Sequence, residues 1–299
     1  MKKEFPTLFI RAFTLIEVMV VVTLLSLIVL ALMAVFDSTQ RAFRASATQA
    51  DVLQGGRAVM DLISQDLKTM SPSDGVSNNP TIVFPDAVNF YAGINNNYPP
   101  LIQPLIASSN ERTNVLENFF ILSSGNQNGV PTWYGTGYAV YLSPTNLYSL
   151  YRFSTSHPMA VAGAVSNMFR FEFENFISAP STYTNSSHLI DGVIGLRVRA
   201  YDLNGVWMTN GYGFNQTVPI KNVLFLPSTF GEVGFYMFSN SLPASVEVEI
   251  ATLEDRTLQR AESFGSLQGM TNYLAWQGGK VHVFRQRISI PNVDPSAYQ

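Results

Sequence analysis

The sequence predicts an α+β fold, in which one long N-terminal helix is joined to a mainly antiparallel, β-rich C-terminal domain. Three observations lead to this prediction. Residues 18–36 carry no charged side chain over nineteen consecutive positions. Residues 37–72 then keep apolar side chains at helical spacing. From about residue 76 onward, apolar and polar residues alternate with a period of two, which is typical of half-buried strands.

The apolar segment is long enough to cross a lipid bilayer. Counted from Phe13 it covers residues 13–36, or about 36 Å as an α-helix, against about 30 Å for the hydrocarbon core. A cleaved secretory signal and a plain transmembrane anchor are the competing interpretations. The first is disfavoured because apolar sequence continues past the small-residue site at residues 29–31. We therefore predict a transmembrane helix.

Residues 37–72 are predicted to continue this helix as an amphipathic segment. Val52, Val59 and Ile63 recur at intervals of seven and four, which places them on one face. Pro72 is expected to end the helix, since the residue before a proline disfavours helical geometry. A bend is expected at residues 55–56, where two glycines follow each other. We expect the apolar face to pack against the domain core.

The C-terminal domain, residues 73–299, contains a series of strand patterns. Strands are predicted at residues 118–122, 138–142, 147–153, 169–174, 193–201, 246–250 and 281–285. Loops are predicted at residues 95–97 and 125–129. Within these strands, four glutamates are expected on solvated faces: Glu172, Glu174, Glu247 and Glu249.

Composition excludes several classes of function. The chain has no cysteine, so disulfide frameworks, lipoprotein anchors and thiol nucleophiles are ruled out. Its three histidines are far apart in sequence, and its net charge of −3 gives no basic surface for nucleic acid. We expect neither a cofactor nor a metal ion.

No catalytic motif stands out. His188 lies near Asp191 in sequence, but no nucleophile accompanies the pair, and a histidine in a surface loop is the simpler interpretation. Calcium ligands are conceivable at four acidic or amide residues, although their spacing matches no ordered calcium loop: Asp202, Asn204, Glu254 and Asp255. The chain is therefore not expected to be an enzyme.

The residues just before the apolar run are more specific. Residues 11–17 read RAFTLIE, so Phe13 opens the long apolar segment and Glu17 follows four positions later. This sequence resembles the cleavage and methylation site of type IV prepilins. The resemblance implies removal of a leader, residues 1–12, by a cut between Ala12 and Phe13, and N-methylation of Phe13. The family usually has glycine where this chain has Ala12; alanine is the smallest replacement, so we expect processing that is slower or still adequate.

Glu17 needs a partner, because an acidic residue near a membrane costs free energy when unpaired. The residues leave two partners open. The amine of a processed Phe13 is one. The other is Thr14, because residues 14–17 fit a capping box, in which the threonine and the glutamate each bind the other's backbone amide. The resemblance to prepilins assigns Glu17 a role in filament assembly.

Other stretches are similar to larger members of the same superfamily. Residues 56–75 resemble the equivalent helix end of minor pilins and pseudopilins. Residues 189–207 and 242–255 are similar to segments of large minor pilins and of the J pseudopilin of type II secretion. Residues 137–153 resemble prepilin-like proteins of Verrucomicrobia-type bacteria.

The resemblance implies a minor pilin or pseudopilin subunit of a type IV pilus or a type II secretion pseudopilus. It further implies a single-pass protein of the bacterial inner membrane, whose C-terminal domain is periplasmic or extracellular in a filament. Its partners would be other pilin or pseudopilin subunits, the prepilin peptidase and an inner-membrane assembly platform. The alternatives are a membrane-anchored binding protein or adhesin that does not polymerise and, less favoured, an anchored hydrolase.

Overall fold

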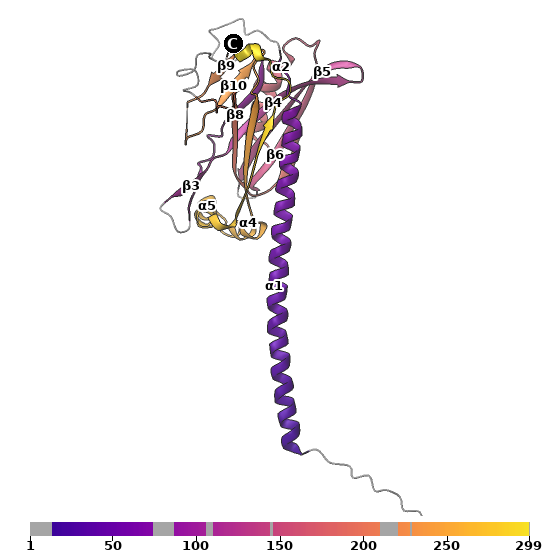
Figure 1. Cartoon of the computed structure of the whole chain (residues 1–299), viewed down its shortest axis with the longest axis vertical. Coiled ribbons are helices and arrows are strands. Elements are labelled where there is room, and N and C mark those ends of the chain that lie inside the picture. The colour runs from indigo at the N-terminus through magenta and orange to yellow at the C-terminus, as the bar shows by residue number, and fades with distance from the viewer. Residues whose placement is uncertain are drawn as a thin grey trace, which may run out of the picture. The chain divides into compact units, whose positions relative to one another are not determined.

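A computed structural model of the chain describes residues 14–73, 87–105, 110–143, 146–209, 221–227 and 229–298. The chain divides into two units, Met1–Gln49 and Ala50–Gln299. Helix α1 (Leu15–Lys68) contributes residues to both (Figure 1). The expected α+β architecture, with one long apolar N-terminal helix and an antiparallel β domain, is confirmed.

The second half of α1 belongs to the core of the second unit. Val52, Val59, Ile63 and Leu67 are buried, which confirms the amphipathic pattern. The helix runs through the glycine pair at residues 55–56 without interruption. A β-carbon placed on Gly56 would lie 2.3 Å from the ring of Phe284, so this glycine allows a close approach of helix and strand.

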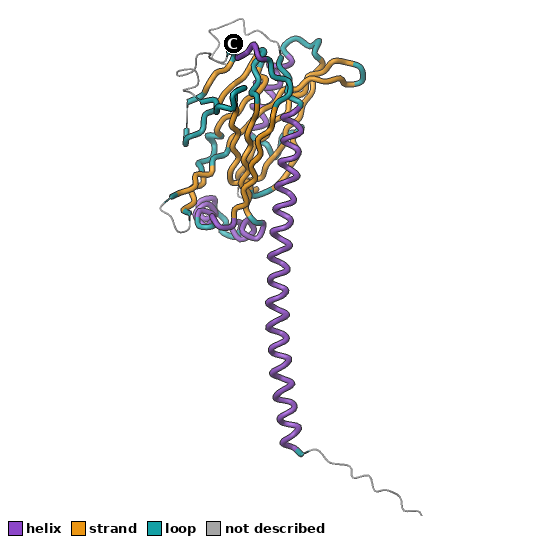
Figure 2. Tube along the Cα trace, in the orientation of Figure 1, coloured by secondary structure: helices purple, strands orange, loops and turns teal. Residues whose placement is uncertain are grey.

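Figure 2 shows strands through most of the second unit. The larger sheet has seven antiparallel strands in the order β7-β6-β5-β4-β1-β10-β9. Its strands are β1 (Val88–Ile94), β4 (Glu117–Gln127), β5 (Val130–Ser143), β6 (Asn146–Pro158), β7 (Ser186–Ile190), β9 (Val223–Phe225) and β10 (Phe235–Phe238). A loop was expected at residues 125–129, but β4 extends to Gln127 and only a two-residue turn remains. Asn128 and Gly129 have φ of 52° and 85°, which is the left-handed backbone that a tight hairpin requires.

A smaller sheet has the order β12-β11-β8, built from β8 (Val193–Tyr201), β11 (Ser245–Leu253) and β12 (Val281–Ser289). A separate hairpin pairs β2 (Leu101–Pro104) with β3 (Glu111–Asn114). One core cluster contains Ile63 of α1, Phe119 of the larger sheet and Val248 of the smaller sheet. The helix and both sheets therefore share a single apolar core.

The opposite face of the larger sheet is covered by short helices, where the sequence had predicted a strand. These helices are α2 (Ala164–Asn167), the π-helical turn η1 (Met168–Phe173) and α3 (Glu174–Ser178). Residues 169–174 lie in η1 and at the start of α3, so the strand prediction is wrong. Phe169, Phe173 and Phe176 are buried against this face, whereas Phe171 is 63% exposed. Spacings of four and three place the three buried rings on one helical face, which outweighs the period-two alternation.

Two further helices, α4 (Asp255–Glu262) and α5 (Leu267–Ala275), connect β11 to β12 through the short turn η2 (Gly278–Lys280). Ser266 caps α5, and its hydroxyl accepts a hydrogen bond of 3.2 Å from the Gly269 amide. In the second unit these helices lie at the end opposite the C-terminal turn η3 (Pro295–Tyr298) (Figure 1).

Candidate functional site

The first half of α1 exposes a continuous apolar surface. Among its large apolar side chains from Leu15 to Phe36, the least exposed is Val29, at 44%. By length and composition this is a helix that can cross a membrane. Thr23 and Ser26 donate their hydroxyl protons to the carbonyls of Val20 and Val22, at 2.9 and 2.8 Å. Their polar groups are thus satisfied within the helix, as a lipid environment requires.

Glu17 and Thr14 close the N-terminus of this helix. The Thr14 amide and the Thr14 hydroxyl both donate to Oε2 of Glu17, each at 2.9 Å. The Glu17 amide in turn donates to the Thr14 hydroxyl at 3.4 Å. These contacts form a capping box. Thr14 is thus one of the two partners that the sequence suggested for Glu17. The other predicted site residues, Ala12 and Phe13, lie outside the described residues.

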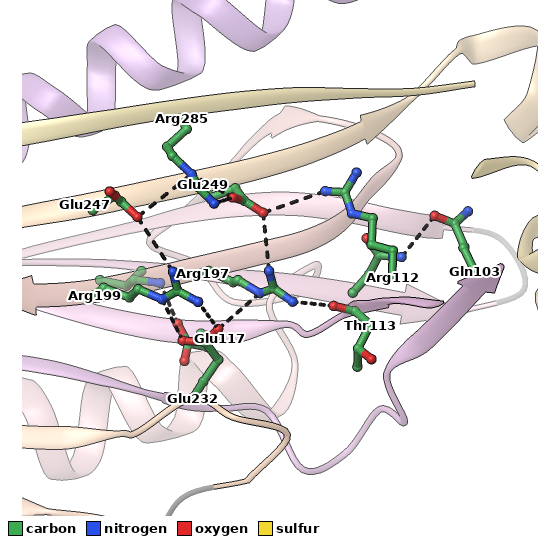
Figure 3. A network of polar contacts seen from close by, with 12 residues as sticks. Gln103, Arg112, Thr113, Glu117, Arg197, Arg199, Glu232, Glu247, Glu249 and Arg285 are labelled. Carbon is green, nitrogen blue, oxygen red and sulfur yellow. Dashed lines mark hydrogen bonds and ion pairs between the residues drawn. The ribbon is translucent and has the colours of Figure 1, made fainter. Parts of the chain in front are cut away.

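Charged side chains gather on the outer face of the smaller sheet (Figure 3). The strand register places Glu249 between Arg197 and Arg285, and Glu247 between Arg199 and Arg287. Two Arg–Glu–Arg rows therefore cross the three strands side by side. Opposite charges directly across a strand pair stabilise the pairing.

Segments outside this sheet complete the network. Arg199 donates two hydrogen bonds to Glu232, from Nε at 2.9 Å and from Nη2 at 2.5 Å. Arg112 of β3 approaches Glu249 at 3.7 Å. Arg197 donates to the carbonyl oxygen of Thr113. No sequence pattern pointed to Glu232 or Arg112, which lie outside β8, β11 and β12.

The network also corrects the expectation that Glu247 and Glu249 are solvated. Glu249 is only 8% exposed, and Nε of Arg285 donates to its Oε2 at 2.8 Å. Glu247 lies 3.8 Å from both Arg199 and Arg285. The sequence did contain a pattern that could have predicted these ion pairs: R-x-R in one strand and E-x-E in another. When two such strands are antiparallel neighbours, each arginine can lie opposite a glutamate.

Glu117 lies beneath this network and is fully buried. Burial raises the pKa of its carboxyl group to about 8, against the lowering effect of a hydrogen bond from the Val198 amide at 2.5 Å. The charge of Glu232 raises the same pKa further, and Arg197 and Arg199 lower it. A neutral carboxyl group at neutral pH follows from this balance.

Glu172 and Glu174 were also expected on a solvated strand face, and Glu172 is not. Its two carboxylate oxygens contact His157 Nε2 and the Thr155 hydroxyl, each at 2.5 Å. The contact joins the helical layer to β6. Glu174 opens α3, where burial raises the pKa of its carboxyl group.

Ser149 contacts Asp191 of the His188–Asp191 pair, but the arrangement of the three side chains does not suit nucleophilic catalysis. His188 Nε2 lies 2.8 Å from Oδ1 of Asp191, and the Ser149 hydroxyl donates to that same oxygen at 2.5 Å. A serine nucleophile needs the imidazole, acting as base, against its hydroxyl. Here the carboxylate separates the two groups, and Ser149 is only 2% exposed. The arrangement is a structural one.

Two of the four candidate calcium ligands, Asp202 and Glu254, have partners within the chain. Oδ1 of Asp202 accepts hydrogen bonds from the amides of Asn204 and Val206, at 2.9 and 2.7 Å, in a tight turn. Glu254 lies 3.6 Å from Lys280. Within the ranges that the structure describes, no three acidic or histidine side chains are grouped as metal ligands would be.

Comparison with protein-family models, with curated proteins and with solved structures finds no match for this chain. The similarity to prepilins therefore rests on the residues quoted above.

Proposed function

We propose that this chain is a minor pilin or pseudopilin: an inner-membrane subunit that prepilin peptidase processes at Phe13 and that assembles into a type IV pilus or a type II secretion pseudopilus. The observation that carries the proposal is the division of α1. Its first half is exposed and apolar with one carboxylate at its start, and its second half is part of the core of a β-rich unit. A subunit that joins others through a membrane helix needs both halves.

The geometry of Glu17 is compatible with an assembly role. Among the described residues, both contacts to its carboxylate fall on Oε2, and Oε1 accepts no hydrogen bond. One oxygen therefore caps the helix while the other can receive a cation. The amine of Phe13 in a neighbouring subunit would be such a cation after processing, since its pKa is ordinarily about 8.

Mass spectrometry of the N-terminus tests the proposal on protein purified from its native membrane. A mature chain that begins with N-methylated Phe13 is expected. An intact Met1 would exclude processing by prepilin peptidase and leave a plain anchor. A start beyond the apolar segment would exclude anchoring as well.

A second candidate is a membrane-anchored binding protein that does not polymerise. The capping box favours it, because Thr14 supplies two hydrogen bonds to Oε2 of Glu17 without any second subunit. Glu17→Gln separates the candidates, since glutamine also closes a capping box but has no charge. A filament subunit would lose incorporation and keep membrane insertion. In a plain anchor, Glu17→Gln would leave membrane insertion unchanged. Thr14→Ala is the matched control, because it removes the capping hydroxyl and keeps the charge of Glu17.

A further inference from the structure

The smaller sheet ends at a long and regular edge strand. β12 pairs with β11 over nine consecutive residues with no shift in register, and no described strand lies beyond it in the order β12-β11-β8. The strand contains no proline. Short strands, prolines and bulges are devices by which proteins keep a sheet edge from pairing with another chain. β12 uses none of these three.

The other sheet edges are covered or short. At the outer side of β8, the Leu196 amide donates to the Val115 carbonyl and the Met208 amide to the Ala200 carbonyl, each at 2.9 Å. In the larger sheet, β9 has three residues, and β7 has five with a shift in register. In the described part of the chain, β12 is therefore the edge best suited to accept a further strand.

The rows of charge across the smaller sheet continue beyond β8 but stop at β12. Beyond β8, Oε2 of Glu232 accepts a hydrogen bond from Nε of Arg199 at 2.9 Å, and Oε1 lies 3.4 Å from Nε of Arg197 (Figure 3). At β12, one row ends with Arg285 and the other with Arg287. The alternation of arginine and glutamate therefore lacks a carboxylate at this edge.

Both arginines at the edge can receive a carboxylate from outside the chain. Arg285 has a side chain that is 53% exposed although it binds Glu249. Arg287 is also exposed; its Nε donates to the Ser245 hydroxyl at 2.8 Å, and its guanidinium carbon lies 3.8 Å from the ring centroid of Tyr201. Within the described ranges, no carboxylate forms an ion pair with Arg287.

This face of the sheet has an excess of positive charge, although the whole chain has a net charge of −3. Glu117 beneath the face is neutral at neutral pH, because burial raises the pKa of its carboxyl group to about 8. Five arginines then meet three ionised glutamates, which leaves two positive charges in excess: Arg112, Arg197, Arg199, Arg285 and Arg287 against Glu232, Glu247 and Glu249.

We propose that the edge of β12 binds an extended acidic segment of another protein, which adds a fourth strand to the smaller sheet and places two carboxylates against Arg285 and Arg287. The two carboxylates must be two residues apart in that segment, because only alternate side chains of a strand share a face. In such strand addition, backbone hydrogen bonds supply affinity and alternate side chains supply specificity. The site lies wholly in the second unit, so it does not depend on anchoring by α1.

A second copy of this chain is not the expected occupant. Two β12 strands that pair antiparallel around Gln286 would place Arg285 opposite Arg287, and like charges directly opposite each other destabilise a strand pair. Acidic residues two positions apart occur in the chain only at residues 172–174 and 247–249. The first pair is in helical structure, and the second lies in β11, which already has a neighbour on each side.

The test measures the binding of fluorescein-labelled peptides to the full natural chain in detergent, by fluorescence anisotropy. The probe is the peptide TTETETT, whose two glutamates share one face of a strand. The control peptide TTTEETT has the same composition and charge, but its glutamates point to opposite faces. We expect it to bind about 2–5-fold more weakly, because one charge pair is lost, and TTQTQTT about 4–25-fold more weakly, because both are lost.

Saturable binding in this order of affinity is the expected result. Equal affinities for TTETETT and TTTEETT would show a general attraction of charge and would overturn strand addition. Absence of saturable binding of TTETETT up to about 1 mM would also overturn it.

Arg287→Gln locates the contact on the protein. It should bind TTETETT about 2–5-fold more weakly than the natural chain. Arg256→Gln, at an exposed position of α4, removes the same charge and is the matched control, which should bind as the natural chain does. Equal affinities of the two variants would contradict the proposal. The comparison of peptides uses the natural chain, so it holds even if Arg287→Gln folds poorly.

Hydrogen exchange measured by mass spectrometry identifies the strand that pairs. The amides of residues 281–289 should exchange more slowly when TTETETT is bound, because the added strand engages the outward N–H groups of β12. The amides of β9, another edge strand, should be unaffected. Protection at β9, or none at β12, would overturn the proposal. A dimer of the natural chain that TTETETT dissociates would show that a second copy occupies the edge, contrary to the proposal.

Discussion

Replacing Gly56 by alanine tests how closely α1 packs on the smaller sheet. The added β-carbon would lie 2.3, 2.4 and 2.8 Å from three ring carbons of Phe284. Overpacking of this kind costs about 1–3 kcal/mol. Alanine also favours the helix over glycine by about 1 kcal/mol. The free energy of unfolding should therefore fall by about 0–2 kcal/mol in Gly56→Ala.

Gly55→Ala is the matched control, because the same helix gains the same propensity one residue away. Its β-carbon would lie 3.0 Å from Cδ1 of Ile190, the end of a flexible side chain that can move aside. We expect Gly55→Ala to be neutral or up to about 1 kcal/mol more stable than the natural chain. The difference between the two variants, about 1–3 kcal/mol, isolates the contact with Phe284.

Urea unfolding in detergent, followed by far-ultraviolet circular dichroism, measures this difference. Phe284→Ala should cancel it, because removing the ring removes the clash, and the double variant Gly56→Ala/Phe284→Ala would then show strong non-additivity. A Gly56→Ala protein as stable as Gly55→Ala would refute the packing argument. It would favour the bend that the glycine pair had suggested.

Three further predictions concern the second unit and are measured by the same unfolding assay. Phe173→Ala should lose about 3–5 kcal/mol of stability and exposed Phe171→Ala less than about 0.5 kcal/mol; equal losses would indicate the strand instead. Glu117, whose carboxyl pKa is raised to about 8, should lower stability as pH rises from about 4.5 to 8, because the folded state then holds a proton that the unfolded state releases. Glu117→Gln should remove that slope, and an unchanged slope would assign it to other groups. Asp66→Asn should cost about 1–3 kcal/mol, because Nε and Nη2 of Arg152 donate to the two carboxylate oxygens of Asp66 at 2.8 and 3.0 Å; a neutral effect would contradict the pairing.

The spacing of apolar residues and the length of each apolar segment made the long helix and most strands predictable. Residues 193–201 form β8 with the predicted bounds, because alternating apolar residues there face a core on one side only. Residues 169–174 show the same alternation and yet are helical. Six residues are too few to separate a period of two from one of 3.6 when Phe171 is an exposed aromatic. Only the wider spacing of Phe169, Phe173 and Phe176 carried the correct information.

The candidate site was predictable only where its parts are neighbours in the sequence. Thr14 and Glu17 are three residues apart, so the capping box could be predicted from the motif. The charged network depends on strand order, which the sequence does not give. Glu117 and Val198 are 81 residues apart, and Glu232 is joined to Arg199 across 33 residues. No local pattern relates such positions.

The charged network binds two segments that lie between strands of the larger sheet in the sequence. β3, which carries Arg112, lies between β1 and β4 in the chain, and Glu232 lies between β9 and β10. Both segments are bound to rows of charge on the smaller sheet, at the face opposite the shared apolar core. The smaller sheet therefore packs against the shared apolar core with one face, and with the other it forms ion pairs with the β2–β3 hairpin and the loop between β9 and β10. Because breaking a partly buried pair leaves an uncompensated charge, these ion pairs hold the β2–β3 hairpin and the loop with Glu232 against the smaller sheet. β12 of this sheet carries Phe284, whose contact with Gly56 sets how closely the helix can approach.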